Sequence, residues 1–290
     1  MQYEGDIYRP PSEAYSLIVQ VTVGCTHNEC TFCESFKAKK FRVKPFETVL
    51  ADLLEARSYY RHVERVFFAD GDALCMTTDK LMRLLDAVRE IFPECTRVGI
   101  YSRASQILNK SEDELVRLRE AGLGIVYIGA ESGSDEVLRR VSKGETAAQI
   151  IAAVQKAEDA GITTSVTFVL GLGGRELMQE HAAKTGEMIS VLGASYVGLL
   201  TLMLDPAAPL YADEQAGKFV QLTPLETLDE LEIILKHTNC EKETVLRSNH
   251  ASNWLVLKGT LPQDKERMLQ QILRAKTDAN MLRPGYLRQL

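Results

Sequence analysis

Short apolar runs alternate with segments of helical periodicity along most of this chain, and this alternation limits the folds open to it. Six runs rich in β-branched and other apolar residues are typical of strands buried on both faces. They cover residues 17–23, 63–68, 97–101, 125–129, 164–170 and 196–201. Helical patterns lie between them at residues 46–60, 80–91, 112–121, 147–160 and 176–192. Successive βα units predict a parallel sheet with right-handed crossovers, built as an open doubly wound sheet or as an incomplete barrel.

The ends of the predicted helices carry local signals. Gly122, Gly161 and Gly193 stand where helices should stop, because glycine readily adopts the left-handed backbone that follows a helix. Ser111 followed by Glu114 matches a capping box at a helix start. Two more helices are predicted at residues 225–236 and 265–276. We therefore expect an α/β fold with a helical C-terminal extension that could close the open side of a barrel.

Composition and charge argue against several classes of protein. The 290 residues include 34 Lys and Arg against 40 Asp and Glu, a net charge of −6, which argues against a nucleic-acid partner. The most basic stretch, residues 37–42, is short and is expected to be a solvated loop. The first residues lack the pattern of a secretory signal, and no apolar run is long enough to span a membrane. Six cysteines, half of them clustered, favour a reducing cytoplasm over a disulfide framework.

Three cysteines follow the first predicted strand with the spacing C-x4-C-x2-C. Cys25, Cys30 and Cys33 supply three thiolates, one fewer than the four that an iron–sulfur cluster takes. In repeated βα folds ligands gather at the C-terminal ends of the strands, where this loop begins. A structural zinc site is one alternative, with His27 inside the loop, although no second C-x2-C or H-x3-H motif follows. The other alternative is three unrelated thiols.

The loop resembles the signature of the radical S-adenosylmethionine (SAM) superfamily. The usual form of that signature is C-x3-C-x2-C with an aromatic residue before the last cysteine, and Phe32 occupies this place. The chain has one extra residue between Cys25 and Cys30, although other spacings occur in the superfamily. The resemblance implies that the three cysteines bind a [4Fe–4S] cluster and that SAM chelates its fourth iron. Reductive cleavage of SAM would then give methionine and a 5′-deoxyadenosyl radical, which abstracts hydrogen from a substrate.

The ends of the second and third predicted strands extend the resemblance. Asp70, Gly71 and Asp72 resemble the Gly-Gly-Glu-type motif of the superfamily, which holds the amino group of SAM. A plain turn after a strand is the alternative, because Asp-Gly is common in turns. Ser102 and Arg103 follow the third strand, where polar side chains of the superfamily reach the ribose or the methionyl carboxylate. Arg103 could equally be a surface residue.

The fourth strand ends in a carboxylate that is expected to bind ligand hydroxyls or an amine. This residue is Glu131. Lys143 matches a basic position in relatives of oxygen-independent coproporphyrinogen oxidase, where a cation would pair with the carboxylate of SAM. The alternative is a lysine at a helix C-terminus before Gly144, which the helix dipole favours in any case.

The last two predicted strands are expected to contact the adenine of SAM. Residues 169–176 partly match the glycine-rich adenine motif G-x-I-x-G-x-x-E, with Val169 in place of the first glycine. Thr167, Val169 and Gly171 would line this part of the site, and Leu200 would add apolar contact. A glycine-rich loop has little specificity by itself, but here each strand end adds a matching feature in the order typical of the superfamily.

A polar cluster in the C-terminal tail is the candidate for substrate contact. Asn249, His250 and Asn253 place an imidazole beside two amides and precede Trp254. A histidine can shuttle protons or bind a metal, and a structural histidine is the alternative. The cluster resembles a motif of stand-alone bacterial radical SAM proteins.

These features predict a radical SAM enzyme with a core at residues 1–205, a partial (β/α)6 TIM-like barrel of parallel strands. An extension at residues 206–290 is expected to close the barrel and contact substrate. The expected partners are a small-molecule substrate, for which a tetrapyrrole-related metabolite is one candidate, and an electron donor such as flavodoxin or ferredoxin. Neither nucleic acid nor a membrane is expected, and the isolated Cys75, Cys95 and Cys240 predict no second cluster. The alternative is a non-catalytic iron–sulfur or zinc scaffold or sensor.

Overall fold

The structure is a computed structural model that describes residues 1–289, and it divides into two compact units. The first unit contains Met1–Asn28, Ser35–Ile128 and Lys156–Thr164. The second unit contains Glu29–Glu34, Gly129–Gln155 and the chain from Ser165 onward. Strand β6 (Leu123–Glu131) and helix α6 (Ala147–Asp159) therefore contribute residues to both units.

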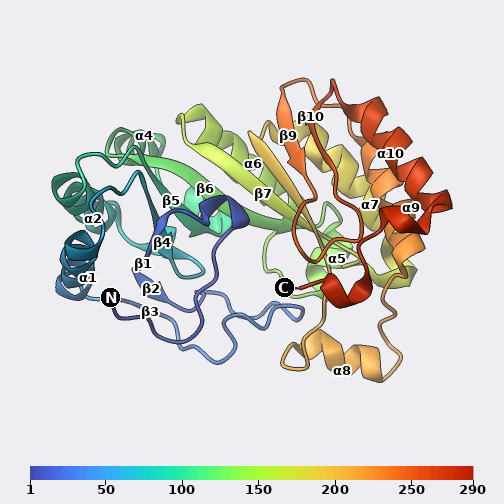
Figure 1. The fold of residues 1–290 in the computed structure, drawn as a ribbon, viewed down its shortest axis with the longest axis horizontal. Coiled ribbons are helices and arrows are strands. Elements are labelled where there is room, and N and C mark those ends of the chain that lie inside the picture. The colour runs from blue at the N-terminus through green and yellow to red at the C-terminus, as the bar shows by residue number, and fades with distance from the viewer. Residues whose placement is uncertain (290) are drawn as a thin grey trace. The chain divides into compact units, whose positions relative to one another are not determined.

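Parallel strands form the sheet of the first unit (Figure 1). Strands β1 (Leu17–Gln20), β4 (Arg65–Ala69), β5 (Arg97–Ser102) and β6 are neighbours in that order. Leu17 of β1 is the partner of Val66 on β4. Val66, Phe67 and Phe68 are fully buried, because a strand inside a parallel sheet is covered on both faces.

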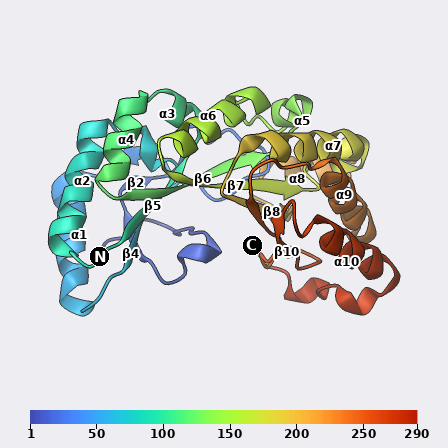
Figure 2. The same ribbon diagram turned by 90° about the horizontal axis from the view of Figure 1, so that it is seen from above.

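Three long helices of the first unit cover one face of this sheet (Figure 2). They are α1 (Phe46–Tyr59), α2 (Thr78–Ile91) and α4 (Glu112–Glu120). Helix α2 packs against both α1 and α4. The predicted capping box starts α4, because Ser111 and Glu114 exchange hydrogen bonds there. Shorter helical segments are η1 (Pro11–Glu13), η2 (Ala73–Cys75) and α3 (Ala104–Leu108).

A two-stranded antiparallel ribbon lies at the two ends of the cysteine loop. Its strands are β2 (Thr22–Val23) and β3 (Arg42–Val43). The prediction of one strand over residues 17–23 is therefore wrong, because the chain changes partner at Val21. The N–H of Val21 donates to the carbonyl of Ala69 on β4, whereas the carbonyl of Val21 accepts from Lys44, next to β3.

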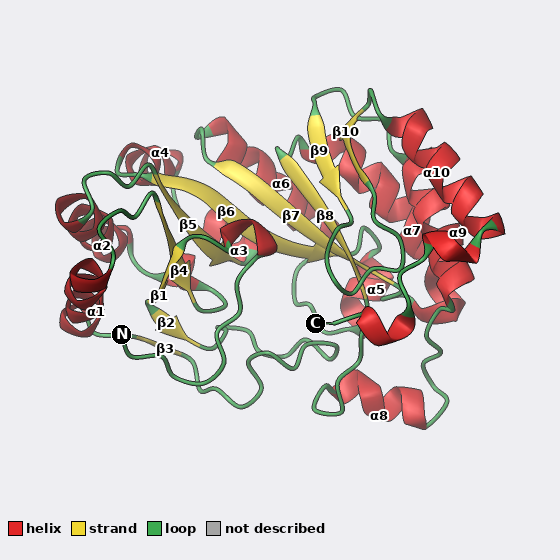
Figure 3. Ribbon diagram, in the orientation of Figure 1, coloured by secondary structure: helices red, strands yellow, loops and turns green. Residues whose placement is uncertain are grey.

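The second unit has a mixed sheet. Strands β7 (Thr163–Leu170), β8 (Tyr196–Thr201), β9 (Thr244–Arg247) and β10 (Lys258–Leu261) are neighbours in that order. The first three are parallel, and β10 is antiparallel to β9. The remaining helices are α5 (Asp135–Arg140), α7 (Gly174–Leu192), α8 (Pro209–Gln215), α9 (Pro224–His237), α10 (Lys265–Thr277), η3 (Ala279–Met281) and η4 (Gly285–Leu287). Helix α9 packs against both α7 and α10 (Figure 3).

Helices α7 and α9 approach one another through a glycine. A Cβ atom at Gly186 of α7 would lie only 2.4 Å from the carbonyl oxygen of Ile234 on α9. Ile234 is fully buried, as are its chain neighbour Leu235 and, almost two turns earlier on the same helix, Leu228. The two helix backbones therefore touch, and side chains of neighbouring turns are brought close together.

Most predicted elements match the structure to within two residues, and β8 has the predicted bounds. Gly122, Gly161 and Gly193 follow helices and have positive φ, as expected. The structure adds short elements that carry no clear periodicity: α3, α5, α8, β9 and β10. Strand β9 pairs with β8, so the predicted extension continues the sheet of the second unit, while the division at residue 205 stays a prediction.

No helix within residues 1–289 combines the length and hydropathy that a membrane span requires.

Candidate active site

The three predicted cluster cysteines are divided between the two units. Cys25 belongs to the first unit, whereas Cys30 and Cys33 belong to the segment Glu29–Glu34 of the second. All three are half-buried thiols that form no disulfide. Within residues 1–289, no three Cys, His, Asp or Glu side chains converge as the ligands of a single metal ion do. The chemistry of the three cysteines fits an iron–sulfur cluster, because accessible thiolates are the usual ligands of such a cluster.

Backbone hydrogen bonds and an aromatic side chain fix the segment that carries the last two cysteines. The N–H of Thr31 donates to the carbonyl of Val141 at 3.0 Å, and the carbonyl of Thr31 accepts from the N–H of Leu210 at 2.8 Å. Phe32 packs against an apolar cluster that contains Val141, Val169 and Leu210. The predicted contact residues Phe32 and Val169 therefore belong to one apolar cluster.

In the first unit, the Asp70 carboxylate binds the start of the cysteine loop. Its Oδ2 accepts from the backbone N–H of Gly24 at 3.1 Å and from Gln20 Nε2 at 3.2 Å. Lys39 Nζ lies 2.8 Å from the same oxygen, and the Asp70 side chain is fully buried. The expectation that residues 37–42 form only a solvated loop is therefore wrong at Lys39, whose ammonium compensates a buried charge.

Asp72 connects three parts of the first unit. Its carboxylate accepts a hydrogen bond from the Thr26 hydroxyl in the cysteine loop, and Oδ1 accepts from the Arg103 N–H at 3.2 Å. Gly71, between the two aspartates, lies against Phe36: a Cβ atom there would be 2.6 Å from that ring. The Asp-Gly-Asp turn therefore orders the loop around Cys25, while its contact with SAM stays a prediction.

Ser102 and Arg103 mark the end of β5. The Ser102 hydroxyl donates to the Arg103 carbonyl at 2.8 Å and is buried, whereas the Arg103 side chain is half-buried. Arg103 also precedes the first residue of α3. The local geometry orders this strand end, and the expected contact of both residues with SAM stays a prediction.

A buried ion pair lies at the end of β6 in the second unit. Lys143 Nζ is 3.1 Å from Glu131 Oε1, and their side chains are 8% and 12% exposed. Glu131 has φ +67° and Ser142 has φ +53°, values that are uncommon outside glycine and cluster at functional sites. Lys143 follows α5, but its ammonium contacts Glu131 instead of standing free in solvent at the helix end.

The charges around Lys143 favour its protonated form. Burial alone would lower the pKa of Lys143, but the negative charges of Glu131, Cys30 and Glu145 outweigh it and raise the pKa above the ordinary lysine value. The second unit therefore keeps a fixed cation in the same neighbourhood as Cys30.

The ends of β7 and β8 present one shared face. Thr167 and Val169 lie two residues apart on β7, so their side chains point to the same side. Val169 is the register partner of Leu200 on β8. Thr167 and Leu200 are half-buried, and Val169 is almost fully buried. The structure therefore brings three of the four predicted adenine residues together on one face of two strands.

The fourth predicted adenine residue, Gly171, is bound by a helix of the predicted extension. Gly171 has φ +81°, which suits glycine, and its N–H donates to Glu230 Oε2 on α9 at 2.7 Å. The loop that follows β7 is therefore fixed by a carboxyl group 59 residues away in sequence.

The tail residues predicted to contact substrate differ in their surroundings. Asn253 is buried: its Nδ2 donates to the Leu199 carbonyl at 2.7 Å, and its Oδ1 accepts from Thr201 Oγ1 at 2.8 Å. His250 is half-buried, and its Nδ1 accepts from the Ser252 N–H. Asn249 is exposed. Asn253 thus attaches the tail loop to β8, and the substrate roles of all three residues stay predictions.

Burial lowers the pKa of His250, and the Arg283 charge acts in the same direction. Arg283 Nη1 also donates to the carbonyls of His250 and Ala251 at 2.8 and 2.6 Å. Arg288 stacks on the Trp254 ring at 3.9 Å and donates to the Ser252 carbonyl. Two arginines from the last described residues therefore fasten the loop that carries His250.

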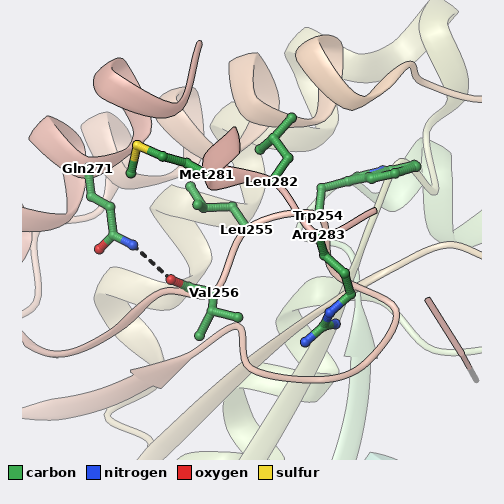
Figure 4. A pocket seen from close by; sticks show the side chains of 7 residues that line it. All are labelled: Trp254, Leu255, Val256, Gln271, Met281, Leu282 and Arg283. Carbon is green, nitrogen blue, oxygen red and sulfur yellow. Dashed lines mark hydrogen bonds between the residues drawn. The ribbon is translucent and has the colours of Figure 1, made fainter. Parts of the chain in front are cut away.

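A hollow of roughly 400 Å³ lies in the tail of the second unit. Figure 4 shows it between the loop segment 254–256, helix α10 and residues 281–283, with Gln271 donating to the Val256 carbonyl. None of the residues predicted to bind the cluster or SAM lines it. The hollow is therefore separate from the predicted cofactor residues.

Residues 19–185 match the radical SAM superfamily, which is more than half of the chain. The chain belongs to the radical SAM superfamily. It is therefore an enzyme of a superfamily whose members use a [4Fe–4S] cluster and SAM. This assignment confirms the resemblance first drawn from the cysteine loop.

Curated relatives of this radical SAM protein carry names that differ in function. The chain is 25% identical over 172 residues to 4′-phospho-dehydrooxetanocin synthase of Priestia megaterium, covering 53% of this chain and 23% of that protein. It is 21% identical over 220 residues to the heme chaperone HemW of Bacillus subtilis, covering 73% of this chain and 56% of that protein. The chain thus spans only part of the length of these relatives.

Among solved structures, the coproporphyrinogen III oxidase HemN of Escherichia coli is similar in fold. The TM-score is 0.56 with 20% identity, covering 76% of this chain and 51% of HemN. Methylornithine synthase gives a TM-score of 0.54 with 14% identity, covering 78% of this chain and 63% of that one. These likenesses confirm the expected α/β fold with a partial TIM-like barrel of parallel strands.

Sequence reasoning missed the partners that order the site. The sequence predicts a solvated stretch around Lys39 and places Glu230 only in a helix. Arg283 and Arg288 carried no motif. Only Glu230 could have been recognised from the sequence. An acidic residue on the apolar side of an amphipathic helix is rarely buried unless it has a hydrogen-bond or charge partner.

Proposed function

We propose that this protein binds a [4Fe–4S] cluster through Cys25, Cys30 and Cys33 and uses SAM to abstract hydrogen from a small-molecule substrate. The observation that carries the proposal is the presence of Cys25, Cys30 and Cys33, which form no disulfide, inside the region that matches the radical SAM superfamily. When bound, the cluster and SAM would supply an electron and a 5′-deoxyadenosyl radical. The chain's own residues then bind, orient and shield these groups.

Lys143 would pair with the carboxylate of SAM. A buried ammonium is a suitable partner for a carboxylate, because a charge-assisted hydrogen bond is stronger where water is scarce. Glu131 keeps the ammonium in place at 3.1 Å when SAM is absent. Glu131 would accept from the hydroxyls or the amino group of SAM once Lys143 turns to the new carboxylate.

The face formed by Thr167, Val169 and Leu200 would receive the adenine ring. Its two apolar side chains offer a flat contact, and the register of β7 and β8 places them side by side. In the first unit, Asp72 and Arg103 would contact the amino and ribose groups. Phe32 would support the loop from its apolar cluster.

The tail of the second unit is the proposed substrate side. His250 is half-buried, has a lowered pKa and is therefore neutral at pH 7, which suits a proton shuttle. An electron donor such as flavodoxin or ferredoxin would reduce the cluster. A reducing compartment such as the cytoplasm suits cysteines that must remain thiolates.

The test is anaerobic reconstitution of the full chain with iron and sulfide, followed by reduction in the presence of SAM. We expect about one cubane cluster per chain and release of 5′-deoxyadenosine. The variant with Cys25, Cys30 and Cys33 replaced by alanine should lose both. The matched control replaces Cys75, Cys95 and Cys240 by alanine and should keep both. Zinc without sulfide in the native protein, or a cluster that survives the first triple substitution, would contradict the proposal.

A further inference from the structure

Three polar side chains form a buried row in the second unit. Ser132 Oγ lies 2.7 Å from His181 Nδ1, and His181 Nε2 lies 3.8 Å from Glu230 Oε1. All three side chains are fully buried. They come from three elements: the end of β6, helix α7 and helix α9.

The facing atoms of His181 and Glu230 are otherwise unpartnered. Among the described residues, neither His181 Nε2 nor Glu230 Oε1 has a hydrogen-bond partner. A buried polar atom without a partner costs free energy, so its retention calls for an explanation. Burial raises the pKa of Glu230 to about 8 and lowers the pKa of His181 to about 4, so both are neutral near pH 7.

The row contacts the proposed adenine motif at two points. Glu230 Oε2 accepts from the N–H of Gly171 at 2.7 Å. On the other side, the backbone of Val169 lies close enough to His181 to oppose part of the effect of burial on its pKa. Glu230 therefore binds one end of the turn Val169–Gly171, and His181 lies near the backbone of the other end.

The other end of the row adjoins Glu131. Ser132 is its chain neighbour, and the following Gly133 lies directly against α7, where a Cβ atom would be 2.2 Å from the Lys184 carbonyl. The N–H of Gly133 donates to Thr185 Oγ1 at 3.0 Å. The end of β6 therefore cannot shift without moving α7, the helix that carries His181.

We propose that Ser132, His181 and Glu230 are positioning residues that hold the turn Val169–Gly171 in the shape that receives the adenine of SAM. They do so by linking that turn to the strand end that carries Glu131. None of the three contacts SAM in this proposal. The inference rests on the proposed function, because it assigns the adenine to this face.

The test measures binding to the full chain, with the cluster reconstituted and left oxidised so that SAM stays intact. Calorimetry gives separate affinities for SAM, 5′-deoxyadenosine and methionine. Glu230→Leu removes the acceptor for the Gly171 N–H. The affinities for 5′-deoxyadenosine and SAM should therefore fall about tenfold, the equivalent of one lost hydrogen bond in a buried setting. Methionine affinity and iron content should not change. Glu230→Gln keeps an acceptor of the same shape and should stay within about twofold of the native protein.

Two further variants keep the test decisive. Asp229→Asn, an exposed neighbour on α9, is the matched control and should leave all three affinities unchanged. Ser132→Ala removes one member of the row with little loss of volume, so it still tests the proposal if Glu230→Leu does not fold. Its affinity for 5′-deoxyadenosine should fall about threefold.

The outcomes separate this inference from the proposed function. If the native protein binds neither cluster nor SAM, the proposed function fails and the inference fails with it. If the native protein binds SAM while Glu230→Leu and Ser132→Ala keep full 5′-deoxyadenosine affinity, only the inference fails. Equal weakening of methionine and 5′-deoxyadenosine would make the row merely structural and would also overturn it.

Discussion

Asp70 accepts three hydrogen bonds on one carboxylate oxygen, and one donor is a lysine 31 residues away in sequence. The carboxylate is fully buried, and Lys39 is the cation that pairs with it. Removal of one partner from a buried pair leaves the other charge without compensation. At the residue scale, the conformation of Gly24, just before Cys25, therefore depends on a side chain from the far end of the loop.

Lys39→Met should lower the free energy of unfolding of the cluster-free protein by roughly 3 kcal/mol, the usual cost of a broken buried pair. Urea denaturation followed by circular dichroism measures it. Lys40→Met changes the exposed neighbour and should stay within roughly 0.5 kcal/mol of the native value. A Lys39→Met protein as stable as the Lys40→Met protein would show that the pair contributes nothing.

At the element scale, the contact between α7 and α9 decides what the second unit can bury. Gly186 allows the helix backbones to touch, and His181 and Glu230 lie about one turn away from that contact. Ridges of small residues let helices approach more closely than leucine or valine would. The buried row of polar side chains is thus a consequence of helix packing as well as of side-chain chemistry.

Gly186→Ala should destabilise the protein, although alanine normally favours a helix over glycine by roughly 0.5–1 kcal/mol. The new Cβ would lie 2.4 Å from the Ile234 carbonyl, and we expect a loss of roughly 1–3 kcal/mol. Thermal unfolding measures the change. The control Gln179→Ala, on the exposed side of the same helix, should be neutral or slightly stabilising. Stabilisation by Gly186→Ala would mean that the helices can separate without cost.

At the scale of the whole molecule, two buried neutral groups shape the pH dependence of stability. Burial raises the folded-state pKa of Glu230 to about 8. The contribution of Glu230 to the free energy of unfolding is therefore fully present below its unfolded-state pKa and is lost as the pH rises through about 8. The folded-state pKa of His181 is lowered by burial to about 4, so its contribution is present above its unfolded pKa and is lost as pH falls towards about 4.

Glu230→Gln should remove the loss at high pH, because glutamine stays neutral. The free energy of unfolding of Glu230→Gln relative to the native protein should therefore rise between pH 5 and pH 8 and then level off. Each unit of pKa shift between the folded and unfolded states changes the free energy of unfolding by about 1.4 kcal/mol. Urea titrations at several pH values measure the difference. A difference that stays constant with pH would mean that Glu230 is already ionised in the folded protein.

The strands and long helices could be predicted because their signals are local. Apolar runs identified β4 and β8, and the Ser111 capping box marked the start of α4. The cysteine loop was informative for the same reason, because its spacing lies within nine residues. Pairs such as Lys39 with Asp70 and Glu230 with Gly171 are 31 and 59 residues apart. No periodicity records such pairs, since they arise only when distant elements pack.

The arginines that fasten the loop around His250 have a consequence for the order of biosynthesis. Arg283 and Arg288 are made after every strand and long helix of the second unit. Domains fold as units while the chain is still being made. Within the second unit, the His250 loop can receive these hydrogen bonds only after both arginines have left the ribosome. In a chain that ends before Arg283, we expect the sheet to form while the His250 loop lacks the hydrogen bonds from the two arginines.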